Sequence, residues 1–306
     1  MGAATSKDRY TRAANTGILT LDKQNISSWS DLVKVLRKLD TLRTITLSHN
    51  PLRSAVPSTF TALPLWATLV SVDLSNNGLT CACALGSETP LAKHHADDAP
   101  ALIAAPPVAN AAHDATRRLP LESLNISGNA LHMLPAHIAL RFPRLRRLVC
   151  TDNTTPLAIP GSLAQCIGTS KSLEVVALQR SGLRQFTIAD DAVMHPFPAL
   201  RELLLDQNHL SGTVSLGFVK DTESPVMPAL RRISLDEQQG SDPLRRVDVI
   251  IFAHCPGLTS LSLRGNRNEA ELHDTLVQSD VYRSWQSRQR DVVDKKLHAG
   301  GMAELI

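Results

Sequence analysis

Aromatic side chains are scarce in this sequence, at 4% of its 306 residues, so its core must be built mainly from aliphatic side chains. Charge of one sign is also lacking, because 32 basic and 29 acidic residues leave a net charge of +3. Proteins that bind nucleic acid usually carry a basic stripe, and this balance provides none. Long hydrophobic runs are missing as well: the sequence has no apolar stretch of about 18 residues, so we expect no membrane-spanning segment.

Cysteine is present without a recognisable pattern. The five cysteines are Cys81, Cys83, Cys150, Cys166 and Cys255. Their number is odd and their spacing matches no disulfide framework, while residues 1–12 are too polar for a secretory signal. We therefore expect five free thiols in a reducing compartment, which places the protein in the cytoplasm.

What the sequence does contain is an internal repeat. The template L-x-x-L-x-L-x-x-N-x-L matches residues 42–52, 69–79, 121–131 and 200–210, and weaker copies begin at Leu145, Leu173, Leu230 and Leu258. A degenerate first copy at residues 19–26 brings the total to about nine units. Six of the seven intervals between first leucines are 24 to 30 residues long, and the seventh, from Leu69 to Leu121, is 52. So many matches in register predict a leucine-rich repeat protein.

The spacing of the template predicts how each unit folds. Positions such as Ile45 and Leu47, two residues apart, point to the same face of a strand and therefore to the interior, whereas Thr46 points outward. A single unit cannot bury its apolar face alone, so neighbouring units must stack, and the template asparagine can bond backbone groups of adjacent turns. The predicted fold class is α/β: a leucine-rich repeat solenoid, curved like a horseshoe. Parallel strands line its concave face, and irregular or short-helical segments such as 138–142 and 162–167 form its convex face.

The repeat pattern also predicts the domain organisation. Residues 1–15 form a polar N-terminal segment, and residues 16–268 form the repeat domain. Residues 269–306 form a helical cap and tail, in which Tyr282 and Trp285 are expected to pack over the last repeat.

Residues 80–118 interrupt the repeat domain. The segment is rich in alanine and proline, which predicts a flexible insertion. It contains Cys81, Cys83, His94 and His95, residue types that bind metal ions. Because the two cysteines are separated by one residue rather than the usual two, we predict no metal site there, and no motif in the chain predicts a cofactor.

The N-terminus matches the pattern M-G-x-x-x-[ST], which predicts N-myristoylation of Gly2. A single myristoyl chain binds a membrane with a constant of only about 10⁴ M⁻¹. Lys7, Arg9 and Arg12 would add attraction to an anionic leaflet. The expected membrane attachment is therefore weak, reversible and peripheral.

Two terminal stretches carry a family resemblance. The opening MGAATSKDRYTRAANTGILTLDKQNI and the closing LRGNRNEAELHDTLVQSDVYRSWQSRQRDVVDKKL resemble the ends of the leucine-rich repeat-containing protein fifty-seven family. The insertion at 80–118 and the degenerate repeat at Leu230 depart from that family. The resemblance implies a cytoplasmic, lipid-anchored adaptor without catalytic residues.

Catalytic signatures are missing from the sequence. It contains no G-x-x-x-x-G-K-[ST], H-E-x-x-H or G-x-S-x-G motif. The eleven histidines are scattered, and we expect them at solvent-exposed structural positions. The prediction is a protein that is not an enzyme and has no small-molecule substrate.

The outward residues at the middle template position form a predicted column. Its members are Thr20, Thr46, Asp73, Asn125, Val149, Ala177, Leu204, Ser234 and Ser262. Three neighbours in it, Val149, Ala177 and Leu204, are apolar, and Val175 lies one column over. Because solvent-facing positions are normally polar, this cluster predicts a partner-binding site. The charged positions around it are Arg147, Glu174, Arg180, Arg201, Glu202, Asp206, Arg231 and Arg232, of which we assign Arg147, Glu202, Asp206 and Arg232 to the site. The alternative is that the apolar residues only supply strand propensity.

The function that these observations predict is a scaffold or adaptor that binds a protein on its concave face. Two alternatives remain open at the level of sequence. One is a structural subunit of a large cytoskeletal, flagellar or ribonucleoprotein assembly. The other is a regulatory subunit of a phosphatase or ligase.

Overall fold

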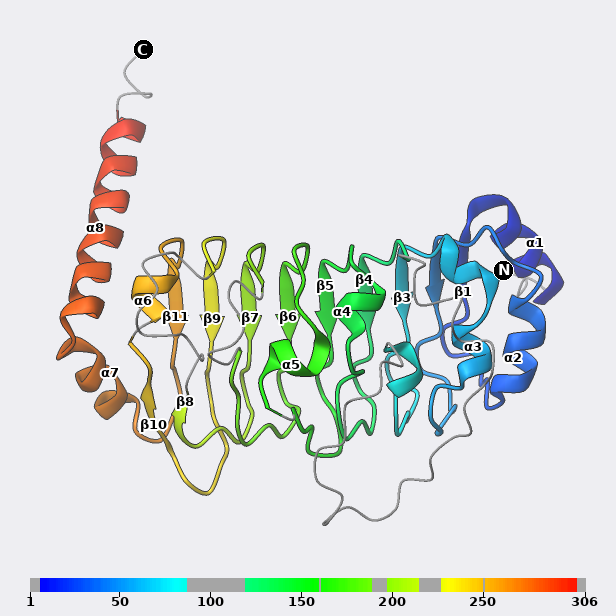
Figure 1. Ribbon diagram of the computed structural model, residues 1–306, viewed down its shortest axis with the longest axis horizontal. Coiled ribbons are helices and arrows are strands. Elements are labelled where there is room, and N and C mark those ends of the chain that lie inside the picture. Colours follow the sequence, from blue (N-terminus) through cyan, green and yellow to red (C-terminus); the bar gives the residue numbers. More distant parts are fainter. Residues whose placement is uncertain are drawn as a thin grey trace.

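The computed structural model describes residues 6–86, 119–159, 161–188, 197–214, 227–249 and 251–301 (Figure 1). Nine short strands stand side by side along the long axis, with helices at both ends of the row. The chain is therefore an α/β protein built on one large parallel sheet.

The main sheet runs in sequence order from one end of the molecule to the other. Its strands are β1 (Ile18–Thr20), β2 (Thr44–Thr46), β3 (Ser71–Asp73), β4 (Ser123–Asn125), β5 (Arg147–Val149), β6 (Val175–Ala177), β7 (Glu202–Leu204), β9 (Arg232–Ser234) and β11 (Ser260–Ser262). Every neighbouring pair is parallel and in register. Because parallel neighbours cannot be joined by a tight hairpin, the chain crosses back behind the sheet between each pair of strands.

The core follows from the alternation of side chains along each strand. The middle residues Ile45, Leu148 and Leu203 are fully buried between outward-facing neighbours. The residue directly after each strand of this sheet from β1 to β9 is buried as well, as Leu47, Leu74, Ile126 and Leu205 show for β2, β3, β4 and β7. Each buried leucine contributes about 1.5–3 kcal/mol, so stability is distributed along the whole row of strands.

A line of buried amides follows the strands, and Asn129 shows how it works. The Nδ2 group of Asn129 donates to the carbonyl oxygens of Leu74 at 3.1 Å and Ile126 at 2.8 Å. Its Oδ1 accepts the N–H groups of Asn77 and Leu79, both at 3.0 Å. One side chain thus satisfies buried backbone groups of two adjacent turns, which confirms the predicted role of the template asparagine.

The amide line changes where it passes from the turn of β5 to that of β6. Ser181 stands there in place of an asparagine, and its Oγ donates to the carbonyl oxygen of Cys150 at 2.8 Å. Asn153, one turn earlier, reaches Ser181 Oγ only at 3.5 Å. The two turns are also joined at the surface, where Arg180 donates to the carboxylate of Asp152.

The long interval between Leu69 and Leu121 adds no strand to the row. Residues 87–118, where most of the predicted flexible insertion falls, lie outside the described residues. Val72 nevertheless pairs directly with Leu124, so β3 and β4 are neighbours.

Short helices occupy the face of the sheet opposite the outward residues. They are α2 (Trp29–Leu36), α3 (Ser58–Thr61), η1 (Pro64–Ala67), η2 (Cys83–Leu85), α4 (Ile138–Arg141), α5 (Leu163–Ile167) and α6 (Ile251–His254). The helical turns predicted at 138–142 and 162–167 are confirmed by α4 and α5. Several of the few aromatic rings gather here: the ring centroid of Phe60 lies 5.0 Å from that of Trp29 and 5.5 Å from that of Trp66.

Helices cover both ends of the row. At the start, α1 (Ser6–Thr16) packs beside β1, where the sequence suggested only a polar segment. At the other end, α7 (Glu269–Val277) leads into α8 (Asp280–Gly301), which extends beyond the sheet (Figure 1). Tyr282 and Trp285 of α8 are buried against Phe252, as expected of residues that cover an exposed end.

A second, two-stranded sheet lies near the C-terminal end and was not predicted. Its strands β8 (Gly212–Val214) and β10 (Leu244–Val247) are parallel. Neither contains a copy of the template, which is why the repeat pattern does not predict them.

Candidate functional site

The predicted column of outward residues is confirmed in its register. Each middle-column residue pairs with the next, from Thr20 on β1 to Ser262 on β11. In particular, Val149 is paired with Ala177, and Ala177 with Leu204. The three apolar members of the column are therefore consecutive neighbours on β5, β6 and β7.

The structure brings the eight predicted binding residues together. Arg147, Val175, Glu202 and Arg232 form the adjacent column on β5, β6, β7 and β9. Asp206 lies two residues beyond Leu204, on the side where the strands end. The predicted residues thus share one surface. We call its four apolar residues, Val149, Val175, Ala177 and Leu204, the apolar strip.

Exposure differs within the apolar strip. Val149, Val175 and Leu204 are half-buried, whereas Ala177 is only 4% exposed. The larger side chains on either side cover Ala177, so Val149, Val175 and Leu204 supply the apolar area of this surface. Ser234, the next member of the column, is likewise 1% exposed, and its Oγ has no hydrogen-bond partner among the described residues.

Toward the N-terminal end of the same face, Ile18 on β1 is 54% exposed, but the next three strands carry only polar outward residues. The outward residues of β2, β3 and β4 are Thr44, Thr46, Ser71, Asp73, Ser123 and Asn125. The apolar strip is therefore a local departure from the composition of this face.

A polar network borders the strip where the strands end. Asp152, Arg180, Gln207 and Glu237 occupy equivalent positions in four successive turns, all with left-handed backbone angles (φ 49–58°). Arg180 donates to Asp152, with Nη2 and Oδ2 3.0 Å apart, and to Gln207 Oε1 at 3.1 Å. Gln207 in turn donates to Glu237 at 2.6 Å. The hydrogen bond from Arg180 lowers the pKa of the Asp152 carboxyl group below its ordinary value.

The predicted charged positions include Arg180 but not Asp152, Gln207 or Glu237, so the network as a whole was not predicted. All four residues stand directly before the template asparagine position, at 152, 180, 207 and 237. That regularity is a signal from which the row of side chains could have been predicted.

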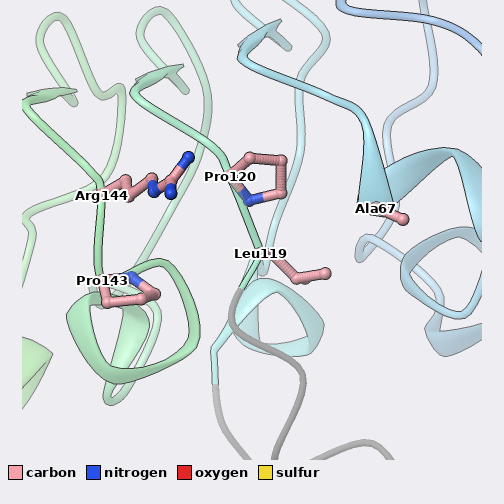
Figure 2. A pocket seen from close by; sticks show the side chains of 5 residues that line it. All are labelled: Ala67, Leu119, Pro120, Pro143 and Arg144. Carbon is pink, nitrogen blue, oxygen red and sulfur yellow. The ribbon is translucent and has the colours of Figure 1, made fainter.

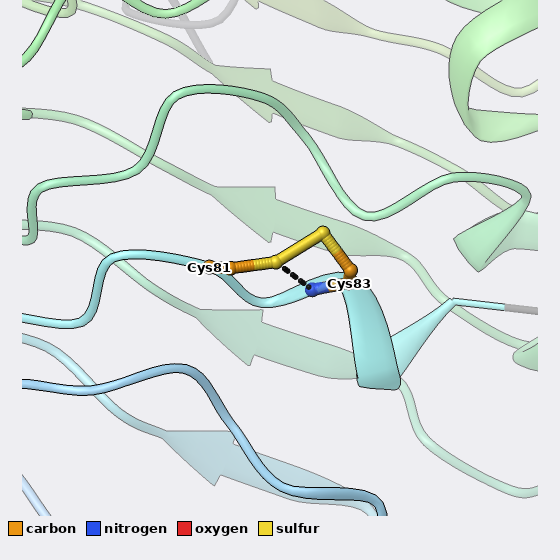
Figure 3. Close-up of a disulfide and its surroundings, with 2 residues drawn as sticks. All are labelled: Cys81 and Cys83. Atoms are coloured by element: carbon orange, nitrogen blue, oxygen red, sulfur yellow. Dashed lines mark hydrogen bonds between the residues drawn. A yellow bond between two sulfur atoms is a disulfide. The ribbon is translucent and has the colours of Figure 1, made fainter. Parts of the chain in front are cut away.

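The cysteines differ from the expectation of five free thiols. Cys81 and Cys83 are joined by a disulfide (Figure 3). A bridge across one intervening residue leaves no framework of spacings, so the sequence pattern did not reveal it. In the described part of the chain, no three histidine, cysteine or acidic side chains gather as a metal site would require, and His94 and His95 lie outside that part.

The remaining thiols are poor nucleophiles. Burial raises the pKa of Cys150 and of Cys255 to about 12 and that of Cys166 to about 11. All three are therefore protonated near neutral pH. Because only a thiolate attacks or binds metal readily, these cysteines are unreactive.

One histidine departs from the expected exposure. His254 at the end of α6 is only 5% exposed, because α6 packs under α8, whereas His49 is exposed as predicted.

A pocket of about 390 Å³ lies where the chain enters β4 and β5 (Figure 2). Its lining residues are Ala67, Leu119, Pro120, Pro143 and Arg144. Figure 2 shows Arg144 extending toward Pro120. The lining offers one cation and no acid, base or nucleophile, so this pocket does not suggest catalysis.

No known family model matches the sequence, and no curated protein shows significant similarity to it. The family resemblance of the two ends therefore stays a prediction. Gly2 lies outside the described residues, so its myristoylation also stays a prediction. Within the described ranges, every helix is too short or too polar to cross a bilayer.

Proposed function

We propose that this chain is a leucine-rich repeat solenoid that acts as a non-enzymatic scaffold or adaptor and binds a protein on the outward face of its nine-stranded sheet. The in-register strands and the line of buried amides support the leucine-rich repeat assignment. The functional part rests on one observation: Val149, Val175 and Leu204 are partly exposed apolar residues on neighbouring strands, whereas the outward residues of β2, β3 and β4 are all polar.

The surroundings of these three residues support binding. An apolar centre with a polar rim is the usual anatomy of a protein interface. Arg147 and Arg232 lie on one side of it and Asp206 on the other. Strand propensity alone does not account for apolar residues gathered on β5–β7 and missing from the outward positions of β2–β4.

The proposal also covers the setting of the protein. We propose a cytoplasmic adaptor, similar in role to the resembled family, that attaches weakly to a membrane through a myristoylated Gly2.

The binding proposal is tested with a double variant, Val149→Asp with Leu204→Asp. Both residues point outward, so thermal stability should stay nearly unchanged while partner capture is lost. The matched control is Thr20→Asp with Ser262→Asp, in the same column but outside the apolar strip. Proximity labelling in the native cell, with quantitative mass spectrometry, would compare the three proteins. Equal labelling of the same proteins by the wild type and the Val149/Leu204 variant would overturn the proposal.

A further inference from the structure

The apolar strip lies between two rows of opposite charge. The side where the strands begin carries more basic than acidic residues: Arg146, Arg147, Arg201, Arg231 and Arg232, with Glu174 and Glu202. On the side where they end, Asp152, Asp206, Asp236 and Glu237 stand against Arg180. We call these rows the basic rim and the acidic rim.

Ion pairs within each rim do not remove its excess charge. Arg146 is paired with Glu174, and Asp152 with Arg180. Among the residues that the structure describes, the guanidinium groups of Arg147, Arg201 and Arg232 make no hydrogen bond or ion pair. The basic rim thus keeps exposed cations available to a partner.

The acidic rim keeps its excess of negative charge for a different reason. Asp206 and Asp236 accept backbone N–H groups, from Asp236 and Arg264 respectively, and Glu237 accepts from the amide of Gln207. These donors orient the carboxylates without neutralising them. The row ends at Arg264, which follows β11.

The dimensions of the strip suit one helix. From Arg147, where β5 begins, to Thr151, two residues after β5 ends, the distance is about 13 Å at about 3.3 Å per residue of extended chain. An α-helix with its side chains is about 10–12 Å across. The three strand-to-strand steps from β5 to β9 span about 14 Å at about 4.8 Å each. A helix laid across the strands would contact both rims along two or three turns.

From this arrangement, and resting on the proposed function, we infer that the occupant is an amphipathic helix of a partner protein with acidic residues on one flank and basic residues on the other. Its apolar ridge lies over Val149, Val175 and Leu204. Its acidic flank faces the basic rim, and its basic flank faces the acidic rim. Complementary charge of this kind suppresses wrong partners, because like charges brought together across an interface cost several kcal/mol.

Three designed helical peptides test the inference on the full-length protein. Each has 18 residues and the same leucine ridge; one has two acidic flanks, one has two basic flanks, and one has a flank of each sign. Fluorescence anisotropy at low salt should show the mixed peptide binding about tenfold more tightly than either of the others. Equal binding of the three, or strongest binding of a single-sign peptide, would overturn the inference.

Charge reversal supplies the second arm. Arg147→Glu with Arg232→Glu makes both rims acidic, so the peptide with two basic flanks should become the tightest ligand. The control is Arg245→Glu with Arg246→Glu, two exposed arginines on β10, which should leave the ranking unchanged. An unchanged ranking in the Arg147/Arg232 variant would also overturn the inference.

A lipid surface is the competing occupant of the basic rim. If vesicles with anionic headgroups displace the mixed peptide, and the Arg147/Arg232 variant loses vesicle binding, the rim serves a membrane and the inference fails. Loss of native partners in the Val149/Leu204 variant would still support the proposed function in that case, so the two failures are distinguishable.

Discussion

The backbone N–H of Asn77 donates a 3.0 Å hydrogen bond to Oδ1 of Asn129, although 52 residues separate the two along the chain. The same oxygen accepts the N–H of Leu79, so one carboxamide joins the turns of β3 and β4. The longest interval in the repeat is therefore closed by the same contact that joins ordinary neighbours.

This contact predicts the cost of removing the amide. Asn129→Ala leaves the buried N–H groups of Asn77 and Leu79 unpaired, and each unpaired buried group costs about 1–3 kcal/mol. We expect the free energy of unfolding, measured by urea denaturation, to fall by about 2–6 kcal/mol. Asn15→Ala, at an exposed position of α1, is the control and should change it by no more than about 0.5 kcal/mol. Equal small effects of the two substitutions would contradict the structural role of the amide line.

The buried thiols predict how stability depends on pH. Burial raises the pKa of Cys150 and Cys255 to about 12, so the folded protein keeps these thiols protonated under conditions in which the unfolded chain ionises them. Their contribution is complete below the unfolded pKa of about 8.5 and is lost as the pH rises toward 12. Each thiol should lower the free energy of unfolding by about 1.4 kcal/mol per pH unit in that window.

The check is a comparison of slopes. Denaturation of the wild type and of a Cys150→Ala, Cys255→Ala variant is measured from pH 8 to 11. Tyrosines and lysines titrate in both proteins, so only the difference between the two slopes reports the thiols. The variant should show the shallower decline, and parallel curves would argue against burial of these cysteines.

The N-terminal motif predicts weak membrane attachment. A protein co-expressed with an N-myristoyltransferase should co-sediment with anionic vesicles, and Gly2→Ala should shift it to the supernatant, because the acceptor nitrogen requires glycine. A constant of about 10⁴ M⁻¹ for one chain means that dilution should release the lipidated protein. Ala3→Ser, which leaves the motif intact, is the control. Sedimentation that is unaffected by Gly2→Ala would refute a lipid anchor.

The template predicted where strands and inward leucines fall, because alternation along a strand is a local property. The positions of Ile45 and Val149 follow from it directly. The 4% exposure of Ala177 does not, since it depends on the sizes of Val149 and Leu204 one turn away on either side. Contacts between turns depend on which residues of neighbouring units lie side by side, and the sequence of one unit does not determine them.

The same distinction explains the other differences. The bond from Arg180 to Asp152 joins separate units, and the burial of His254 depends on α8 packing over α6. The strands β8 and β10 lie outside the template altogether. Sequence periodicity therefore predicts the main sheet and its outward columns, whereas the shape and charge of the surface need the stacked structure.

The turns of β5 and β6 are joined by a buried serine hydroxyl, that of Ser181, and, at the surface, by the ion pair between Arg180 and Asp152, so salt that screens this pair should loosen their contact. A ligand bound over Val149 and Ala177 would contact both strands and hold these two turns together from outside.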